Sequence, residues 1–507
     1  MPTELTSRLA FPTPSGNLNP APSAGAPAAS RFDRLCLFTL AWAVANVLHA
    51  TSFSYRITQG RPFLFPLMLA AALTVLLPQR LWPFMVMLTL SVANTFDWMP
   101  DMPNHLLFEF ILNCGMLALL TGLVAAHYLR GGTAAGLTTP AAREALFNAF
   151  APAVRISLLL LYFYAVLHKL NHDYFNPNIS CSTFLLSGYH ERFAFMPDTI
   201  GSRWLAVWGT IVVELAIPLL LLFRRTRWAA ILLGFGFHYF LSVHPHPGLY
   251  SFSSLLFALF TLFFPVDFPE KTRLFAQRWF GAALPRLTLA LRALVAGLAA
   301  GLALLAFLRL NHSIGILKLG GLFIWLGWGL LLMLTYVLVS RQSQGKLTPE
   351  RFASAYGVRL AAAWLIPLVV IFNGLSPYLG LKTQTSFSMF SNLRTEGGIT
   401  NHLFMPVSLQ MTNWQRDLVE VLDTDLPQLR PYLTNNEVLT YFEFRRITSK
   451  AANANFYVNY RRNNQLQTAT VRNGISNQPE LLVPHNWLAA KLIRFRDIDK
   501  GPCLCKH

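Results

Sequence analysis

The sequence predicts a mainly α-helical membrane protein, in which a bundle of about nine to eleven transmembrane helices precedes a C-terminal extramembrane domain that contains β-strands. Two observations predict this class. The 507-residue chain is 54% hydrophobic and only 13% charged, whereas soluble proteins average about 25% charged residues. Apolar stretches of about 17–25 residues, each long enough to span a bilayer, recur along the chain.

The candidate spans follow one another from residue 35 to residue 380. Two short stretches within 62–96 are also compatible with re-entrant or interfacial segments. We therefore expect a disordered tail over 1–30, a transmembrane domain over 31–266, additional transmembrane helices over 267–382 and an extramembrane domain over 383–507. The expected spans are 35–54, 62–78, 81–96, 105–128, 152–170, 204–223, 228–243, 248–266, 286–308, 316–339 and 359–380.

The first 30 residues are rich in Pro, Ala, Ser and Gly, a composition typical of disordered segments. They lack a basic stretch followed by an apolar stretch and a small-residue cleavage site, so we do not expect a secretory signal. The first span is therefore expected to stay in the membrane.

The net charge of +18 is better explained by membrane topology than by nucleic-acid binding. Positive residues in the short loops between spans set orientation, because they stay on the cytoplasmic side. Loops rich in positive charge alternate with loops that hold few positive residues, which predicts a cytoplasmic N-terminus and an external location for residues after about 381. We expect the lipid bilayer to be the main partner. The loops rich in positive charge contain Arg31, Arg34, Arg80, Arg130, Arg143, Arg155, Arg224, Arg225, Arg227, Lys271, Arg273, Arg278, Arg341, Lys346 and Arg351.

Five cysteines are too few and too scattered for a disulfide scaffold. The chain has neither a CxxC pair nor an HExxH motif, and we expect no metal site. The pair Cys503 and Cys505 lies in the last five residues. It is either part of a frayed tail or a redox pair in an oxidising compartment.

The region after residue 383 alternates apolar and polar residues, which is typical of half-buried strands. This pattern predicts strands at Tyr441-Phe-Glu-Phe-Arg-Arg and at Ala454-Asn-Phe-Tyr-Val-Asn-Tyr, and a short helix over 486–493. Within the preceding segment, we expect Arg394 and Glu396 to form an ion pair that folds the loop.

Polar and ionisable residues gather at the ends of the fourth and fifth spans, on the side expected to be external. Asn104 and His105 begin the fourth span. His168, Lys169 and Asn171 end the fifth. Because polar and ionisable groups are costly within hydrocarbon, each is a candidate functional residue, although a lysine at a helix end can also snorkel to the headgroups.

Two more ionisable residues lie within predicted spans. Glu214 lies in the middle of the sixth span, where a hydrogen bond to a neighbouring helix and a role in binding substrate or a proton are both open. His238 follows small residues that allow close helix contact, so it either packs between helices or lines the site.

Several segments together resemble a known family. Tyr162-Phe-Tyr-Ala-Val-Leu-His-Lys-Leu-Asn resembles the lysine-bearing helix end of vitamin K-dependent γ-carboxylases and their bacterial relatives with the HTTM domain. Pro103-Asn-His-Leu-Leu resembles the Asn-His segment of these enzymes, and Glu214-Leu-Ala-Ile-Pro-Leu-Leu and 252–262 resemble later spans. The segment from Gly380 to Gly398 is similar to an extension in bacterial members. The resemblance covers about residues 31–266.

The resemblance implies that a reduced quinone is oxygenated by O2 and then acts as a strong base, after which CO2 adds to the deprotonated carbon. It implies that Lys169 deprotonates the hydroquinone and that His105 supports the oxygenated intermediate. A lysine is a base only as the free amine, which apolar surroundings favour. It further implies a bacterial inner-membrane protein whose C-terminal domain is periplasmic.

The sequence also departs from the family. His168 stands where the eukaryotic enzymes have a second lysine, and residues 383–507 show no propeptide-binding module. We therefore expect quinol oxygenation, with any coupled carboxylation and its acceptor left open. The alternative is a non-catalytic membrane scaffold that binds a lipid or a quinone. A transporter is a weaker third interpretation, because we find no inverted repeat.

Overall fold

The computed structural model describes residues 32–505, apart from residue 247 and the segments 309–313 and 342–354. The predicted disordered tail over 1–30 lies outside the described residues. The chain divides into two compact units. The first comprises residues 1–95, 109–159 and 217–369, and the second comprises residues 96–108, 160–216 and 370–507.

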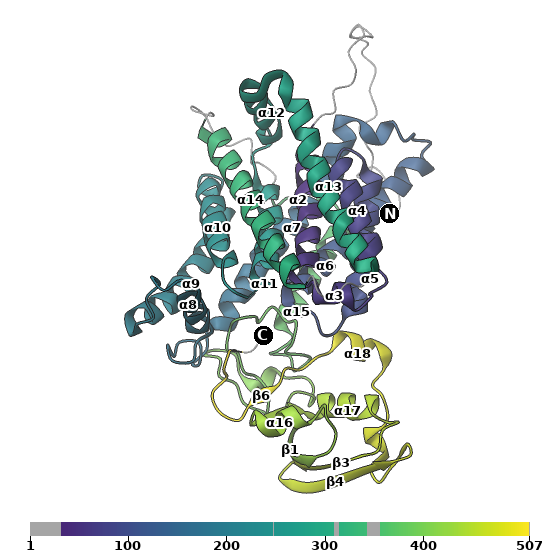
Figure 1. Ribbon diagram of the computed structural model, residues 1–507, viewed down its shortest axis with the longest axis vertical. Helices are drawn as coiled ribbons and strands as arrows, with labels where there is room; N and C mark the ends of the chain where they lie inside the picture. The colour runs from purple at the N-terminus through teal and green to yellow at the C-terminus, as the bar shows by residue number, and fades with distance from the viewer. Residues whose placement is uncertain (1–31, 247, 309–313, 342–354, 506–507) are drawn as a thin grey trace. The chain divides into compact units, whose positions relative to one another are not determined.

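The first unit is built from helices. Its centre is α2 (Arg34–Ser52), of which almost every side chain is buried. Helices α4 (Leu64–Leu76), α11 (Gly248–Phe260) and α14 (Ile314–Arg341) pack against α2, and α13 (Leu284–Leu308) lies beside α4 (Figure 1). The unit also contains α3 (Tyr55–Thr58), α10 (Arg227–Ser242), α12 (Phe268–Phe280) and most of α5 (Leu81–Trp98).

Besides α5, four helices contribute residues to both units: α6 (Asn104–Leu129), α7 (Pro140–Lys169), α9 (Ile200–Leu222) and α15 (Leu365–Leu375). The start of α6 and the end of α7 belong to the second unit. This unit also contains α8 (Cys181–Arg192), whose N-terminus is capped by the Ser180 side chain.

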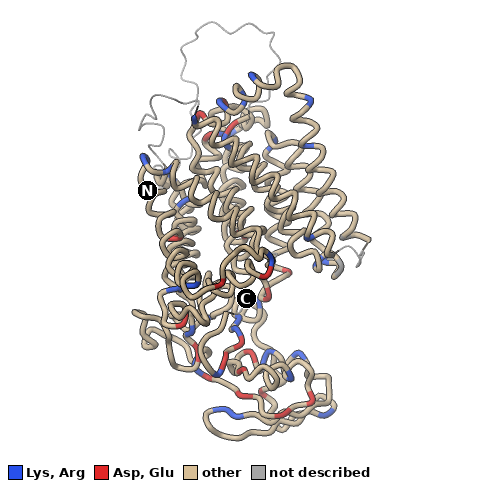
Figure 2. Tube along the Cα trace, turned by 60° about the vertical axis from the view of Figure 1, so that its left-hand side comes forward, with Lys and Arg blue, Asp and Glu red and all other residues tan. Residues whose placement is uncertain are grey.

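The predicted helical membrane architecture is confirmed. Within the described residues, six helices are long and apolar enough to cross a membrane, namely 34–52, 104–129, 140–169, 200–222, 268–305 and 315–341. Shorter apolar helices lie over 64–76, 248–263 and 361–375. Charged residues are sparse along these helices and gather at helix ends and in the C-terminal region (Figure 2).

The predicted β-containing C-terminal region is also confirmed. It forms a six-stranded sheet in the order β5-β4-β3-β1-β2-β6, and every pairing is antiparallel. Its core contains Val421, Leu439, Phe444, Val458 and Tyr460. The strands are β1 (Leu418–Thr424), β2 (Glu437–Thr440), β3 (Phe456–Arg462), β4 (Gln465–Arg472), β5 (Ile475–Ser476) and β6 (Ile498–Asp499).

One of the two predicted strands is wrong. Ala454–Tyr460 largely coincides with β3, but Tyr441 begins helix α17 (Tyr441–Lys450). The Thr440 hydroxyl accepts a hydrogen bond from the Glu443 backbone at 3.3 Å. A threonine followed three residues later by a glutamate is a helix-start signal, and it outweighs an alternation of only a few residues. The remaining helices are α16 (Arg430–Thr434) and α18 (Trp487–Leu492), and α18 confirms the helix predicted over 486–493.

Candidate functional site

Lys169 is the last residue of α7, and its side chain is buried against α9. The residue is 4% exposed. Its Nζ donates hydrogen bonds to Glu214 Oε2 at 2.7 Å and to the backbone oxygen of Ala165 at 3.2 Å. Tyr162, two turns earlier on α7, is 3% exposed and lies close enough to interact electrostatically with Glu214. Lys169 therefore does not snorkel outward but forms a buried ion pair.

A second tyrosine adds to the surroundings of this pair. Tyr174 is fully buried, and its ring centroid lies 6.0 Å from Lys169 Nζ, within the range of a cation–π contact. Its hydroxyl lies 2.5 Å from Ser182 Oγ. Burial, followed by the nearby Glu214 carboxylate, raises the pKa of Tyr174, so this phenol stays protonated.

The carboxyl end of α7 is capped by the segment 391–403. The last carbonyls of a helix lack partners within the helix and need them elsewhere. His402 Nε2 lies 2.9 Å from the backbone oxygen of Leu167. The backbone nitrogen of Leu403 donates to the backbone oxygen of Leu170 at 2.9 Å. This cap fixes the helix end that positions Lys169.

Asn171 and His168 take part in the same end structure. The Asn171 side chain is fully buried and donates to the backbone oxygens of His168 at 2.8 Å and Ser391 at 2.6 Å. The His168 ring is also fully buried, and its Nε2 lies 3.0 Å from the Gly374 backbone oxygen. These contacts hold the end of α7, and binding of a substrate by either residue stays a prediction.

Asn104 and His105 begin α6. The Asn104 side chain accepts a hydrogen bond from the backbone nitrogen of Phe387 at 2.7 Å. The Phe387 ring is 1% exposed and packs edge-on against Phe108 at 5.8 Å. His105 is 3% exposed. Phe387 contacts the start of α6, and the segment 391–403, which caps α7, follows it closely in the chain. The same stretch of the second unit therefore holds both helix ends.

The segment that contacts α6 has an unusual backbone. Its φ values are positive at Thr385 (57°), Phe387 (65°), Phe390 (53°) and Asn392 (52°). Left-handed backbone costs roughly 1–2 kcal/mol at a residue other than glycine, so surrounding contacts must hold it there. Asn373 supplies one such contact, because its side chain donates to the Thr385 backbone oxygen at 3.0 Å.

Lys382 begins this segment and did not stand out in the sequence. Its Nζ donates to the Thr385 hydroxyl at 3.3 Å. Burial lowers the pKa of Lys382 to about 7. Lys382 is another lysine of the second unit and the natural comparison for Lys169.

His238 lies in the first unit, on α10, and is 2% exposed. Its ring lies 5.0–6.3 Å from the rings of Phe237, Phe252 and Phe260. The packed interpretation of this histidine therefore fits its surroundings. A role in binding substrate stays a prediction.

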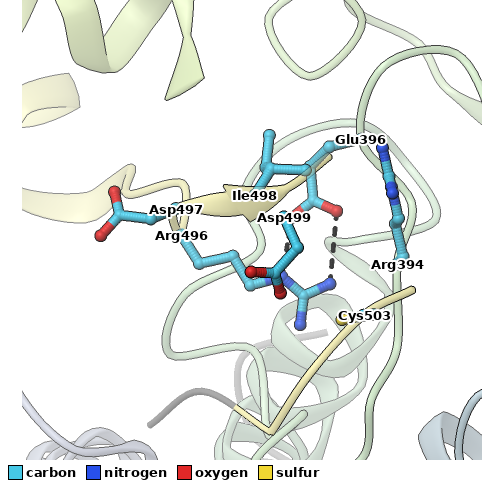
Figure 3. A pocket seen from close by; sticks show the side chains of 7 residues that line it. All are labelled: Arg394, Glu396, Arg496, Asp497, Ile498, Asp499 and Cys503. Carbon is cyan, nitrogen blue, oxygen red and sulfur yellow. Dashed lines mark hydrogen bonds and ion pairs between the residues drawn. The ribbon is translucent and has the colours of Figure 1, made fainter. Parts of the chain in front are cut away.

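The expected ion pair between Arg394 and Glu396 is wrong. Glu396 is fully buried and accepts hydrogen bonds from Arg496 at 2.9 and 3.2 Å (Figure 3). Arg394 instead donates to the backbone oxygen of Gly501 at 2.8 Å. A small pocket beside the pair has room for about one water molecule. The guanidinium of Arg496 offers two N–H groups from a distant part of the chain, which no local pattern reveals.

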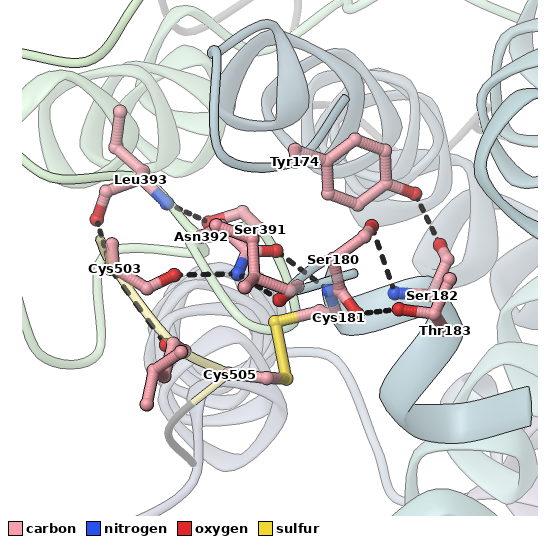
Figure 4. The surroundings of a disulfide bond; sticks show 12 residues. Tyr174, Ser180, Cys181, Ser182, Thr183, Ser391, Asn392, Leu393, Cys503 and Cys505 are labelled. Carbon is pink, nitrogen blue, oxygen red and sulfur yellow. Dashed lines mark hydrogen bonds between the residues drawn. A yellow bond between two sulfur atoms is a disulfide. The ribbon is translucent and has the colours of Figure 1, made fainter. Parts of the chain in front are cut away.

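Neither interpretation of Cys503 and Cys505, as part of a frayed tail or as a redox pair, is right, because Cys505 forms a disulfide with Cys181 at the start of α8 (Figure 4). Cys503 keeps a buried thiol. Asn392 joins the two chain segments, since its side chain accepts from the Cys181 backbone at 2.7 Å and donates to the Cys503 backbone oxygen at 2.7 Å. The tail is thus fixed to the segment that holds α6 and α7.

These features define a polytopic helical membrane protein whose second unit joins buried ionisable helix ends to a disulfide-linked β-containing region. Residues 104–268 match the model of the HTTM domain. The match starts at the first residue of α6 and includes every residue proposed here for the site. Neither a curated protein nor a solved structure matches the chain.

Proposed function

We propose that this protein is a membrane enzyme that oxygenates a reduced quinone to its epoxide, with Lys169 as the base and His105 as a stabilising group. The observation that carries the proposal is the buried Lys169–Glu214 ion pair. A buried ion pair contributes little net stability compared with apolar side chains of the same size, so a purely structural role explains it poorly. The resemblance of this helix end to the γ-carboxylases gives the pair a chemical role.

The pair can act as a proton acceptor. A proton that moves along the 2.7 Å hydrogen bond converts the ammonium and carboxylate into an amine and a carboxylic acid without changing the net charge. The amine of Lys169 can then accept a phenolic proton from a hydroquinone, while Glu214 holds the proton that the lysine gave up.

His105 would stabilise the oxygenated intermediate of the proposed reaction. His105, buried at the start of α6, can donate a hydrogen bond to negative charge that develops on a bound oxygen. The reduced quinone and O2 would supply the oxidation chemistry as substrates. Coupled addition of CO2 to an acceptor stays part of this proposal without an assigned residue, and so does the identity of any protein partner.

The direct test is to incubate purified protein with reduced menaquinone or vitamin K and O2 and to assay the epoxide. A protein that binds the quinone but forms no epoxide would favour the alternative, a non-catalytic scaffold that binds a lipid or a quinone.

His105→Ala is expected to reduce epoxide formation by about 10²–10³-fold, the loss typical for one stabilising donor. Binding of the reduced quinone should change little, because the donor acts on charge that develops later. A small amine added to the solution should not restore activity. Normal epoxide formation by His105→Ala would remove this residue from the site, and Asn104→Ala tests separately whether the start of α6 needs its contact with Phe387.

We also propose that the protein lies in a bacterial inner membrane with residues 383–507 outside the cytoplasm. The Cys181–Cys505 disulfide supports this orientation, because disulfides persist in oxidising compartments. Thr470→Cys on β4, in a variant whose other thiols are blocked, should react with a membrane-impermeant thiol reagent in intact cells. Labelling only after lysis would reverse the topology.

A further inference from the structure

The segment 399–415 of the second unit contains no Asp, Glu, Lys or Arg residue and carries exposed apolar side chains along its length. Phe404 and Met411 are 71% and 77% exposed. Exposed apolar side chains that gather in one place indicate contact with a protein or a membrane. The exposed apolar residues of the segment are Ile399, Leu403, Phe404, Leu409, Met411 and Trp414.

The large polar side chains of the segment are turned inward instead. The His402 ring is buried against the end of α7. The buried side chains of Gln410 and Gln415 donate to the backbone oxygens of Thr395 at 2.6 Å and of Pro377 at 2.9 Å. Water favours the reverse arrangement, because it solvates polar groups and drives apolar ones inward. The segment is therefore built for apolar surroundings.

The backbone of the segment is attached beyond the ends of two apolar helices. The backbone nitrogen of Leu403 donates to the backbone oxygen of Leu170, directly after α7, at 2.9 Å. The backbone nitrogen of Met411 donates to that of Leu379, shortly after α15, at 2.9 Å. Helix α7 is long and apolar enough to cross a membrane, and α15 is a shorter apolar helix. The segment therefore lies near the level at which these helices leave the hydrocarbon.

We propose that the segment 399–415 lies in the membrane interface at the Lys169 end of α7, with Phe404 and Met411 inserted among the lipids. Amphipathic surface segments insert their apolar side about 5–10 Å into the boundary between headgroups and acyl chains, and tryptophan, here Trp414, is enriched at this level. The partner is lipid rather than protein, because the segment is hydrogen-bonded at the membrane ends of helices. This inference does not depend on the proposed oxygenation.

The sheet of the same unit supplies matched controls. Leu466 on β4 and Ile475 on β5 are 73% and 76% exposed, as much as the two most exposed apolar side chains of the segment. Each lies opposite an arginine of the neighbouring strand, Leu466 opposite Arg461 and Ile475 opposite Arg472. A charged neighbour suits water, and single exposed apolar side chains are common on water-facing surfaces. We therefore expect these two residues to face water.

Fluorescence quenching in lipid nanodiscs tests the proposal. The variants Phe404→Cys, Met411→Cys, Leu466→Cys and Ile475→Cys each carry a thiol-linked bimane, and the unsubstituted protein treated in the same way gives the background. The labels on the segment should lose most of their fluorescence to lipids brominated near the headgroup end of the acyl chains, and little to iodide in the water. The labels on the sheet should show the opposite pattern.

Iodide quenching on the segment as strong as that on the sheet would place the segment in water and overturn the proposal. Labels on the segment that neither quencher reaches would overturn it too, because a protein surface would then cover them. Each side chain is mostly exposed, so its replacement should leave the fold intact, and either position of the segment is decisive alone. The readout involves no epoxide, so failure of the proposed oxygenation would not affect it.

Discussion

Lys169→Met is expected to reduce quinol epoxidation by about 10²–10⁴-fold, the usual contribution of a positioned base. Methionine has a similar length but no nitrogen, so no amine is left to accept the phenolic proton. The measurement is the initial rate of epoxide formation by purified protein at equal amounts of folded wild type and variant.

Three comparisons separate chemistry from folding. Lys169→Met leaves Glu214 buried without its partner, so the variant that also carries Glu214→Gln removes the unpaired acid and should remain inactive. Lys382→Met is the matched lysine control and should keep its activity. A small added amine should partly restore Lys169→Met if the site admits it. Full activity of Lys169→Met would contradict the proposed chemistry.

Glu396→Gln is expected to destabilise the second unit by about 3–5 kcal/mol, because it leaves the buried charge of Arg496 without its partner. Burial raises the pKa of Glu396, but the charge and hydrogen bonds of Arg496 outweigh it, and the net pKa is lowered. A carboxyl whose pKa is lowered by folding stabilises the protein above its unfolded pKa and loses this effect as the pH falls through its folded pKa. Acid should therefore destabilise the wild type more than the variant.

Denaturant unfolding of the detergent-solubilised protein at neutral and acidic pH measures this difference. Glu420→Gln is the matched control, because Glu420 pairs with Lys500 at 2.6 Å on the surface. Such surface pairs contribute about 0–1 kcal/mol. Equal stability losses in the two variants would show that Glu396 is not a buried anchor of the segment.

The sequence predicts where the helices lie along the chain far better than it predicts which residues contact one another in the fold. Apolar stretches such as 105–128 and 204–223 identify α6 and α9 because hydropathy is a local property. The strand predicted at Tyr441 is wrong because Phe442 and Phe444 alternate with polar residues in the sequence, although Thr440 and Glu443 carry a helix-start signal for α17. Local patterns compete, and tertiary contacts decide between them.

In the candidate site too, the sequence predicts single residues but not the residues that they contact. Lys169 and His105 stand out because ionisable residues are costly at membrane depth. The partner of Lys169 lies 45 residues away, and the two cysteines of the disulfide are 324 residues apart. No local pattern selects such pairs.

The most direct test of the central proposal is to supply reduced quinone and isotopically labelled O2 to purified wild-type and Lys169→Met protein and to analyse the product by mass spectrometry. We expect quinone epoxide that carries the label in the wild-type reaction and only background in the variant. Equal background-level epoxide from both proteins, with intact quinone binding, would contradict an oxygenating enzyme and indicate a binding protein.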